Sequence, residues 1–346
     1  MELYIKGINC ISPVGSFDNI DHLPEVRLTK EGLKYYSCIE PVAYKEIINP
    51  VLIRRMSRAM KIGIASALFC LKDSKIEMPD AIITGTGLGC VEDSDKFLVS
   101  LIENEEKMLN PTPFIQSTHN TISSQIALML KCHGYNSTYA GRGACFETAM
   151  LDALMLISDN EASNVLVGAY DELIQNQIKI LYRLGQFRNY KKLNNISGNL
   201  PGEGAAFFVL SDKQSETDYA KLVGMEIISS DNYLSENISE FLNKYSIESK
   251  NINSVLLGVE NTNLENSNYS DVINLFPFSN LLWFKRLCGE YMTDSAFALW
   301  LATNILKSQK IPENIIIRKN NTNALDNILI VNKISGNQTA LFLLKK

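Results

Sequence analysis

Thiols and imidazoles are the side chains of this chain with which nucleophilic catalysis could be built. The seven cysteines, at positions 10, 38, 70, 90, 132, 145 and 288, are an odd number without a C-x-x-C pair, which predicts neither a disulfide framework nor a metal site. The only histidines are His22, His119 and His133, so no imidazole follows residue 133. A G-x-S-x-G elbow, which a serine hydrolase would need, is absent. We therefore expect most of the thiols to be buried, and we predict no cofactor.

Composition and charge narrow the class of protein. The 346 residues are 46% hydrophobic and 21% charged, which is typical of a globular protein with a large core. The net charge of -5 argues against binding to nucleic acid or to an anionic membrane surface, because both need a basic excess. No apolar run reaches the roughly 18 residues of a membrane span, and the first residues lack the layout of a signal peptide. A cytoplasmic location is expected.

Short apolar runs that end in Gly, Asn or Asp alternate with longer helical stretches, which predicts strands covered by helices. The predicted strands are Leu3–Asn9, Ala81–Thr86, Asn164–Gly168, Ala205–Leu210, Ser254–Val259, Asn314–Arg318, Asn327–Val331 and Ala340–Leu344. The predicted helices are Arg54–Leu71, Ser123–Lys131, Phe146–Ser158 and Ser295–Leu306.

The order of these elements repeats. A strand, a helix, a strand and a final strand follow one another up to residue 213, and the same series recurs from Ser254 to the C-terminus. The polar segment that begins at Lys213 is a natural joint. We expect an α/β protein of two duplicated halves, residues 1–212 and 213–346, related by a pseudo-two-fold axis.

Four motifs carry a resemblance to a known family. They are YIKGINCISPVG from Tyr4, AIITGTGLGC from Ala81, NVLVGAYDE from Asn164 and PGEGAAFFVL from Pro201, with a fainter match at Lys285 and Gly289. In order and spacing they resemble the beta-ketoacyl-carrier-protein synthases of the thiolase-like superfamily. The resemblance implies a five-layered αβαβα fold in which two half-sheets bury a central pair of helices.

The resemblance also locates the catalytic positions, and this chain departs from the family at each. Gly143 falls where the family has its nucleophilic cysteine, at the start of a helix whose partial positive charge would stabilise a thiolate. The nearest thiol is Cys145, which would point to the opposite helix face. The family's histidines fall near Glu260 and on Glu290, where a carboxylate would repel the developing oxyanion. Lys285 matches a family residue and could pair with Glu290, either in the pocket or as a solvated surface pair.

Two further comparisons with the family point the same way. The Gly-Phe-Gly-Gly gate loop of active synthases becomes Ile334–Asn337, without its aromatic residue. For His119 and His133 a structural role is expected, because no nucleophile and second acid–base group lies in the motif around either.

These departures favour a synthase-like protein without the Cys-His-His triad. The resemblance implies a chain-length-factor-type subunit that pairs with an active ketosynthase in fatty-acid or polyketide biosynthesis, including polyenes, and meets acyl carrier protein through that partner. The family dimer joins through edge strands, here around Asn136–Ala140. Two alternatives remain open: a decarboxylative condensing acyltransferase that uses Cys145, and a homodimeric acyl-binding protein.

Overall fold

The computed structural model describes residues 2–41, 44–187, 200–229, 234–259, 269–320, 324–335 and 337–346. The strands are β1 (Leu3–Ile11), β2 (Val26–Leu28), β3 (Lys34–Tyr36), β4 (Ala81–Thr86), β5 (Tyr135–Ala140), β6 (Asn164–Asp171), β7 (Gly204–Ser211), β8 (Ala220–Ile228), β9 (Ser254–Leu257), β10 (Asn280–Trp283), β11 (Ile316–Arg318), β12 (Asn327–Ser335) and β13 (Gln338–Lys345). The helices are α1 (Tyr44–Ile47), α2 (Pro50–Ile53), α3 (Arg58–Ser74), α4 (Val91–Glu103), α5 (Pro111–Gln116), α6 (Thr121–Leu130), α7 (Cys145–Ser158), α8 (Gln175–Arg183), α9 (Leu234–Lys244), α10 (Ser270–Leu275), α11 (Lys285–Cys288) and α12 (Asp294–Ser308).

Eleven strands form one mixed sheet in which the two halves of the chain repeat the same strand order. The first half runs β5-β4-β6-β7-β1 and the second runs β10-β9-β12-β13-β8, with β11 added beyond β10. In each half the first three strands are parallel to one another, and each of the last two runs antiparallel to the strand before it in this order. The halves are joined where Leu3–Ile5 of β1 pairs with Ala220–Leu222 of β8. This repeat agrees with the duplicated fold expected from the sequence.

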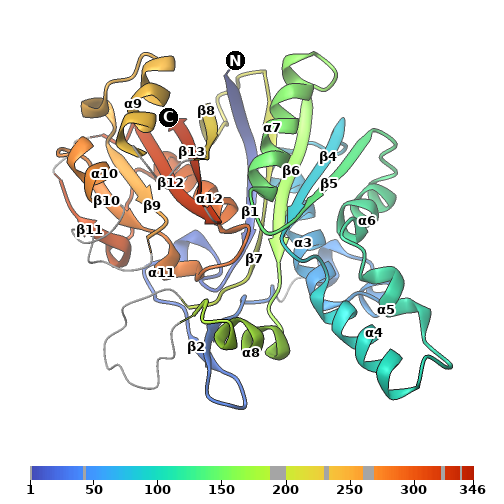
Figure 1. Cartoon of the computed structure of the whole chain (residues 1–346). Coiled ribbons are helices and arrows are strands. Elements are labelled where there is room, and N and C mark those ends of the chain that lie inside the picture. Colours follow the sequence, from blue (N-terminus) through green and yellow to red (C-terminus); the bar gives the residue numbers. More distant parts are fainter. Residues whose placement is uncertain are drawn as a thin grey trace.

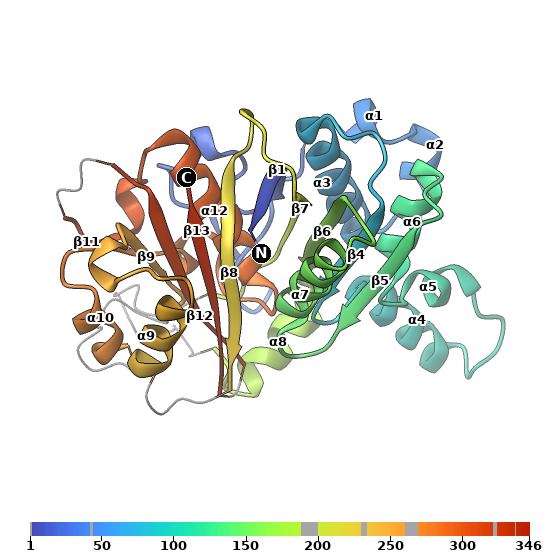
Figure 2. The same ribbon diagram turned by 90° about the horizontal axis from the view of Figure 1, so that it is seen from above.

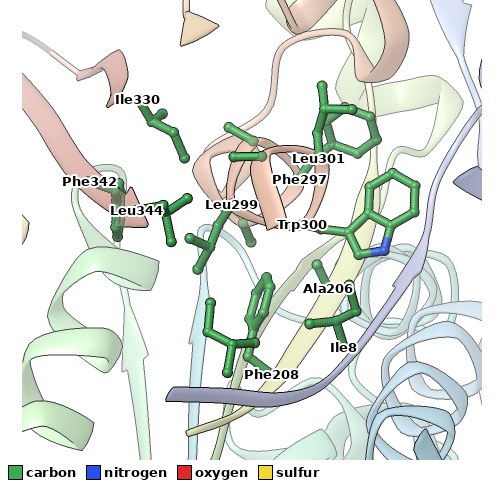
Figure 3. Close-up of a cluster of buried hydrophobic side chains, with 14 of the residues drawn as sticks. Ile8, Ala206, Phe208, Phe297, Leu299, Trp300, Leu301, Ile330, Phe342 and Leu344 are labelled. Atoms are coloured by element: carbon green, nitrogen blue, oxygen red, sulfur yellow. The ribbon is translucent and has the colours of Figure 1, made fainter. Parts of the chain in front are cut away.

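The five layers follow from which face each apolar side chain takes, because successive residues of a strand point to opposite faces. On β4, Ile83 joins the central core around α7 and α12, whereas Ile82 joins the core beneath α3 and α6. On β12, Ile330 faces the central core and Leu329 faces α9 and α10. Both views show α9 and α10 at one end of the molecule, α3 and α6 at the other, and α7 and α12 between them (Figures 1 and 2). Figure 3 shows the central core, in which α12 packs against strands of both halves.

Most of the expected elements are present, with shifted boundaries. The helix expected from Arg54 begins at Arg58, because Pro50 starts a separate short helix and Ser57 then caps α3 with extended backbone. The strand expected from Asn314 begins at Ile316, after a 3-10 turn. The sequence reasoning missed β8, whose apolar pattern is interrupted by Gly224 and Glu226 and which forms by pairing with β13.

Candidate functional site

A cavity of about 380 Å³ opens where the two halves meet, beside the start of α7. Its polar wall comes from both halves of the chain: Arg142, Asp171, Glu172, Gln177, Gln186, Lys285 and Glu290. Leu88, Leu173, Leu181, Phe187, Met292 and Ile334 are among its apolar wall residues. The described lining residues therefore supply charge and amides, and include neither a thiol nor an imidazole.

The turn from β5 into α7 brings the helix start against the sheet. Gly85 of β4 lies so close that a Cβ atom there would be 2.7 Å from the Phe146 backbone nitrogen, so only glycine allows this approach. Arg142, in the turn, is exposed and reaches the cavity, whereas Cys145, the first residue of α7, is buried and is not among the described lining residues. The helix start therefore presents a guanidinium group to the cavity.

The Cys145 thiol is held in its protonated form. Its Sγ donates a hydrogen bond to the Gly141 carbonyl oxygen at 2.8 Å. Burial, reinforced by the nearby Asp171 carboxylate, raises the pKa of this thiol to about 11. The helix start was expected to stabilise a thiolate at the family's nucleophile position. At Cys145 the loss of solvent outweighs that effect.

Asp171, at the end of β6, ties the Gly-rich turn after β4 to the start of α12. Its Oδ1 accepts hydrogen bonds from the backbone N–H groups of Gly87 (2.8 Å) and Leu88 (3.4 Å) and from the Thr86 hydroxyl, and its Oδ2 accepts from the Thr293 hydroxyl at 2.8 Å. Burial raises the pKa of Asp171 to about 6, although these donors oppose the shift. With its oxygens so occupied, this carboxylate holds the cavity wall together.

Its neighbour Glu172 caps the start of α4. Its Oε1 accepts a hydrogen bond from the Glu92 backbone N–H at 2.9 Å, where the helix dipole favours negative charge. Burial nevertheless raises the pKa of Glu172 to about 7. The carboxylate therefore changes charge near neutral pH on the cavity wall.

Lys285 is buried, with 4% of its side chain exposed, and its ion pair is with Asp294 at 3.1 Å. Asp294 also accepts a hydrogen bond from the Asn332 side chain at 2.7 Å, and the same amide donates to the Ser295 hydroxyl. Although burial disfavours the ammonium, the Asp294 and Glu290 carboxylates raise the pKa of Lys285 above its usual value. The solvated surface pair considered from the sequence is therefore wrong. Lys285 forms an ion pair with Asp294, and the Glu290 carboxylate also acts on the ammonium.

Glu290 is fixed on the cavity wall by its backbone. Its N–H donates to the Leu200 carbonyl oxygen at 2.8 Å, and its own carbonyl oxygen accepts from the Gly202 N–H at 3.0 Å. A Cβ atom on Gly202 would lie only 1.9 Å from the Cys288 carbonyl oxygen. Position 202 therefore requires glycine, because a side chain there would prevent the segment that carries Glu290 from packing against Pro201–Gly204.

The three imidazoles lie elsewhere. His22, His119 and His133 are all exposed, and none is among the described residues that line the cavity. The backbone oxygen of His119 accepts a hydrogen bond from the buried Tyr170 hydroxyl, so the main chain at His119 has a structural role. Across the described ranges no three His, Cys, Asp or Glu side chains are grouped as a metal site would require. Nor does any helix in those ranges have the length and apolar character for crossing a membrane.

Comparisons with known proteins agree with the fold. Residues 37–181 match the family model described as beta-ketoacyl synthase, N-terminal domain. The chain is therefore similar to this family over residues 37–181, and as a whole it has the thiolase-like fold of the ketosynthases. A search of curated protein sequences finds no match to this chain.

Solved structures with the same fold cover essentially the whole chain. The ishigamide ketosynthase/chain length factor is 16% identical with a TM-score of 0.83, covering 100% of this chain and 99% of the other. A beta-ketoacyl synthase from Burkholderia phymatum STM815 is 15% identical with a TM-score of 0.79, covering 100% and 99%. The ketosynthase ApeO in complex with its chain length factor ApeC from Xenorhabdus doucetiae is 15% identical with a TM-score of 0.76, covering 99% and 97%.

The catalytic and gate positions expected from the resemblance are only partly brought together. Lys285, Glu290 and the gate residue Ile334 all line the cavity. Gly143 lies in the turn before α7, where a Cβ atom would be 3.3 Å from the Gln338 side chain. Glu260 and the gate residue Gly336 lie outside the described residues.

Sequence reasoning missed Arg142, Asp294 and Glu147. Glu147 and Asp294 are both buried in the first turn of a central helix. An acidic residue in the first turn of a largely apolar helix was the available signal, because such a group is rarely buried without a specific environment. Arg142 lies in a turn, where the sequence offers no comparable signal.

We expect Cys145 to resist alkylation in the native protein. With a pKa of about 11 the thiolate fraction at pH 7 is roughly a few hundred times smaller than that of a free thiol, so reaction with iodoacetamide should slow in proportion. Mass spectrometry of the tryptic peptide that contains Cys145 measures the rate, and the protein unfolded in urea is the reference for full reactivity. Labelling at the rate of free cysteine would show that the thiol is ionised and accessible, contrary to this account.

Proposed function

We propose that this chain is a chain-length-factor-type subunit that has no condensing activity of its own and pairs with an active ketosynthase. The observation that carries the proposal is the protonated Cys145 thiol, buried at the start of α7 beside a cavity whose described lining residues include neither thiol nor imidazole. A condensing enzyme needs a thiolate that faces its substrate.

The charges around the cavity support the same conclusion. Decarboxylative condensation passes through an oxyanion, which is stabilised by hydrogen-bond donors aimed at it. At the cavity wall Glu290 and Glu172 provide carboxylates, and the Lys285 ammonium is already engaged by Asp294. Glu290 therefore opposes a second negative charge, and Glu172 does so when it is ionised, whereas the Arg142 guanidinium offsets part of this charge. In this proposal condensation, and with it the meeting with acyl carrier protein, takes place on the partner subunit.

The surface through which the partner would bind is the end of the sheet at β5. Among the described strands it pairs with β4 alone, so its other edge is open to a strand of a second chain. Leu128 of α6 and Met155 of α7 flank it, with exposed fractions of 73% and 63%. Figure 2 shows β5 at the edge of the sheet between these two helices. An open edge with apolar flanks is typical of a protein interface.

Co-expression with a ketosynthase from the source genome tests the proposal. We expect an affinity tag on this chain to retain the ketosynthase in equal amounts. We also expect the pair to make a product of different length from that of the ketosynthase alone, while the isolated chain makes none. Turnover of malonyl-loaded carrier protein by the isolated chain would overturn the proposal.

Replacing Leu128 and Met155 together with aspartate should abolish co-purification. Each apolar side chain that an interface buries contributes about 1.5–3 kcal/mol, so losing both should weaken binding by roughly two orders of magnitude or more. Phe278→Asp is the matched control, because Phe278 is also exposed, at 70%, but precedes β10 in the other half of the chain. Equal retention of the ketosynthase by the double variant and the control would place the interface elsewhere.

The two alternatives give distinct results in the same experiments. An acyltransferase that uses Cys145 would become labelled by a radioactive acyl carrier protein and would lose the label in Cys145→Ala. A homodimeric acyl-binding protein would elute as a dimer and leave the ketosynthase product unchanged. Either result would exclude the proposed subunit role.

A further inference from the structure

A second cavity, of about 400 Å³, lies between β1, α3 and α12. Its walls come from segments far apart in the chain, including Asn9, Phe17, Ile39, Phe69, Tyr219 and Trp300. None of the described residues that line it also lines the cavity beside α7. Its volume falls within the roughly 300–1,000 Å³ of small-molecule sites.

The sheet itself creates this cavity. β1 pairs with β8 only through Leu3–Ile5, while the rest of β1 pairs with β7 on its other edge. Ile8, Asn9, Cys10 and Ile11 line the cavity, just beyond the point where pairing with β8 ends. Beyond Ile5 this edge of β1 therefore faces a space that none of the described strands fills.

The lining restricts the chemistry of an occupant. Phe17 packs edge-on against Trp300 with ring centroids 6.1 Å apart, and Phe69 and Pro41 add further flat apolar surface. Among the described lining residues none carries a charge. An ion would therefore lose its hydration without a counter-charge, whereas a neutral planar molecule would bury apolar area against aromatic faces.

Polar groups on the cavity wall would orient a bound molecule through hydrogen bonds. The Asn9 side-chain oxygen is buried and has no hydrogen-bond partner among the described residues. Asn304 uses its amide nitrogen to donate to the Trp300 carbonyl oxygen at 2.8 Å, which leaves its side-chain oxygen as an acceptor. The indole nitrogen of Trp300 lies on the side of the ring that faces β1 (Figure 3). A buried acceptor without a partner is costly, and a ligand N–H or O–H would satisfy it.

We propose that this second cavity is a binding site for a small, neutral, planar apolar molecule that donates a hydrogen bond to Asn9. The site does not depend on the subunit role proposed above, so the isolated chain is the material to test. Its function would be recognition of a small aromatic or heterocyclic compound rather than of an acyl thioester.

Indole and 1-methylindole are suitable probes, because they have nearly the same shape and only indole has an N–H donor. Ligand-observed NMR and calorimetric titration of the isolated chain measure the two dissociation constants. We expect indole to bind about fivefold more tightly than 1-methylindole, the difference that one neutral hydrogen bond makes. Equal affinities, or no binding of either probe up to its solubility, would overturn the proposal.

Two variants and a control locate the binding. Ile39→Trp changes a residue that is 56% exposed at the cavity wall, so it should block the cavity without disturbing the core and weaken both probes about tenfold or more. Asn9→Leu should remove the preference for indole and leave 1-methylindole unchanged. Leu28→Trp is the control, because Leu28 is 60% exposed and is not among the cavity residues. Unchanged binding in Ile39→Trp would show that the probes bind elsewhere, against the proposal.

Discussion

Glu203→Ala should destabilise the protein by about 3–5 kcal/mol, the usual result of removing one partner of a buried ion pair. The Glu203 carboxylate is 1% exposed and receives a bidentate contact from Arg58 at 2.5 and 2.7 Å. It also accepts hydrogen bonds from the Ser37 hydroxyl and from the backbone N–H groups of Cys38 and Leu173. Alanine leaves the Cys38 and Leu173 N–H groups without this acceptor, and leaves the guanidinium with only the Ser37 hydroxyl and the exposed Glu40 carboxylate. Urea denaturation followed by circular dichroism measures the loss.

Glu40→Ala is the matched control for this prediction. Glu40 contacts the same guanidinium at 2.8 Å, but its side chain is 42% exposed. An exposed ion pair contributes only about 0–1 kcal/mol, so this variant should unfold at nearly the same urea concentration as the parent protein. If both variants lost the same free energy of unfolding, the buried contacts of Glu203 would not contribute the stability predicted here.

Glu147→Gln should stabilise the protein at pH 8 and leave its stability near pH 4.5 almost unchanged. Glu147 is 1% exposed on α7, and neither of its carboxylate oxygens has a hydrogen-bond partner among the described residues. Burial raises its pKa to about 7 from an ordinary value of 4.5. As the pH rises through this range the unfolded state loses the proton first, so stability falls. The full cost, above pH 7, is about 3 kcal/mol.

Thermal unfolding at several pH values measures this effect. The parent protein should lose stability between about pH 4.5 and 7, and Glu147→Gln should lose less because an amide cannot ionise. Glu161→Gln is the control, since Glu161 is exposed just beyond the end of α7 and its neutralisation should change little. A Glu147→Gln variant with the same pH dependence as the parent would show that Glu147 keeps the same charge in the folded and unfolded protein.

Much of the fold could be predicted because each strand and helix carries its own pattern. β4, β6 and β13 are continuous apolar runs, which is how strands covered on both faces are recognised. The expectation that most thiols are buried is confirmed, since all seven cysteines are buried and free. β8 was missed for the opposite reason. Its pattern is broken by Gly224, where a Cβ atom would lie 2.1 Å from the Tyr245 ring. The local sequence does not reveal that contact.

The candidate site shows the same division. Lys285, Glu290 and Ile334 were named from the sequence and do line the cavity. The ion pair of Lys285 with Asp294 was not predicted, because only the packing of the start of α12 brings that carboxylate to the ammonium. Whether Cys145 is ionised was likewise decided by burial and by Asp171 on a neighbouring strand.

The sequence by itself determined the α/β class, the repeat of elements and the resemblance to the synthase family, because these depend on residue types and on spacing along the chain. The tertiary structure alone decided which charges meet, as with Arg58 and Glu203, which are 145 residues apart. It also decided where β1 separates from β8 and leaves a cavity. Ion pairs, pKa shifts and cavities depend on distances through space, and distant segments acquire those distances only when the layers pack.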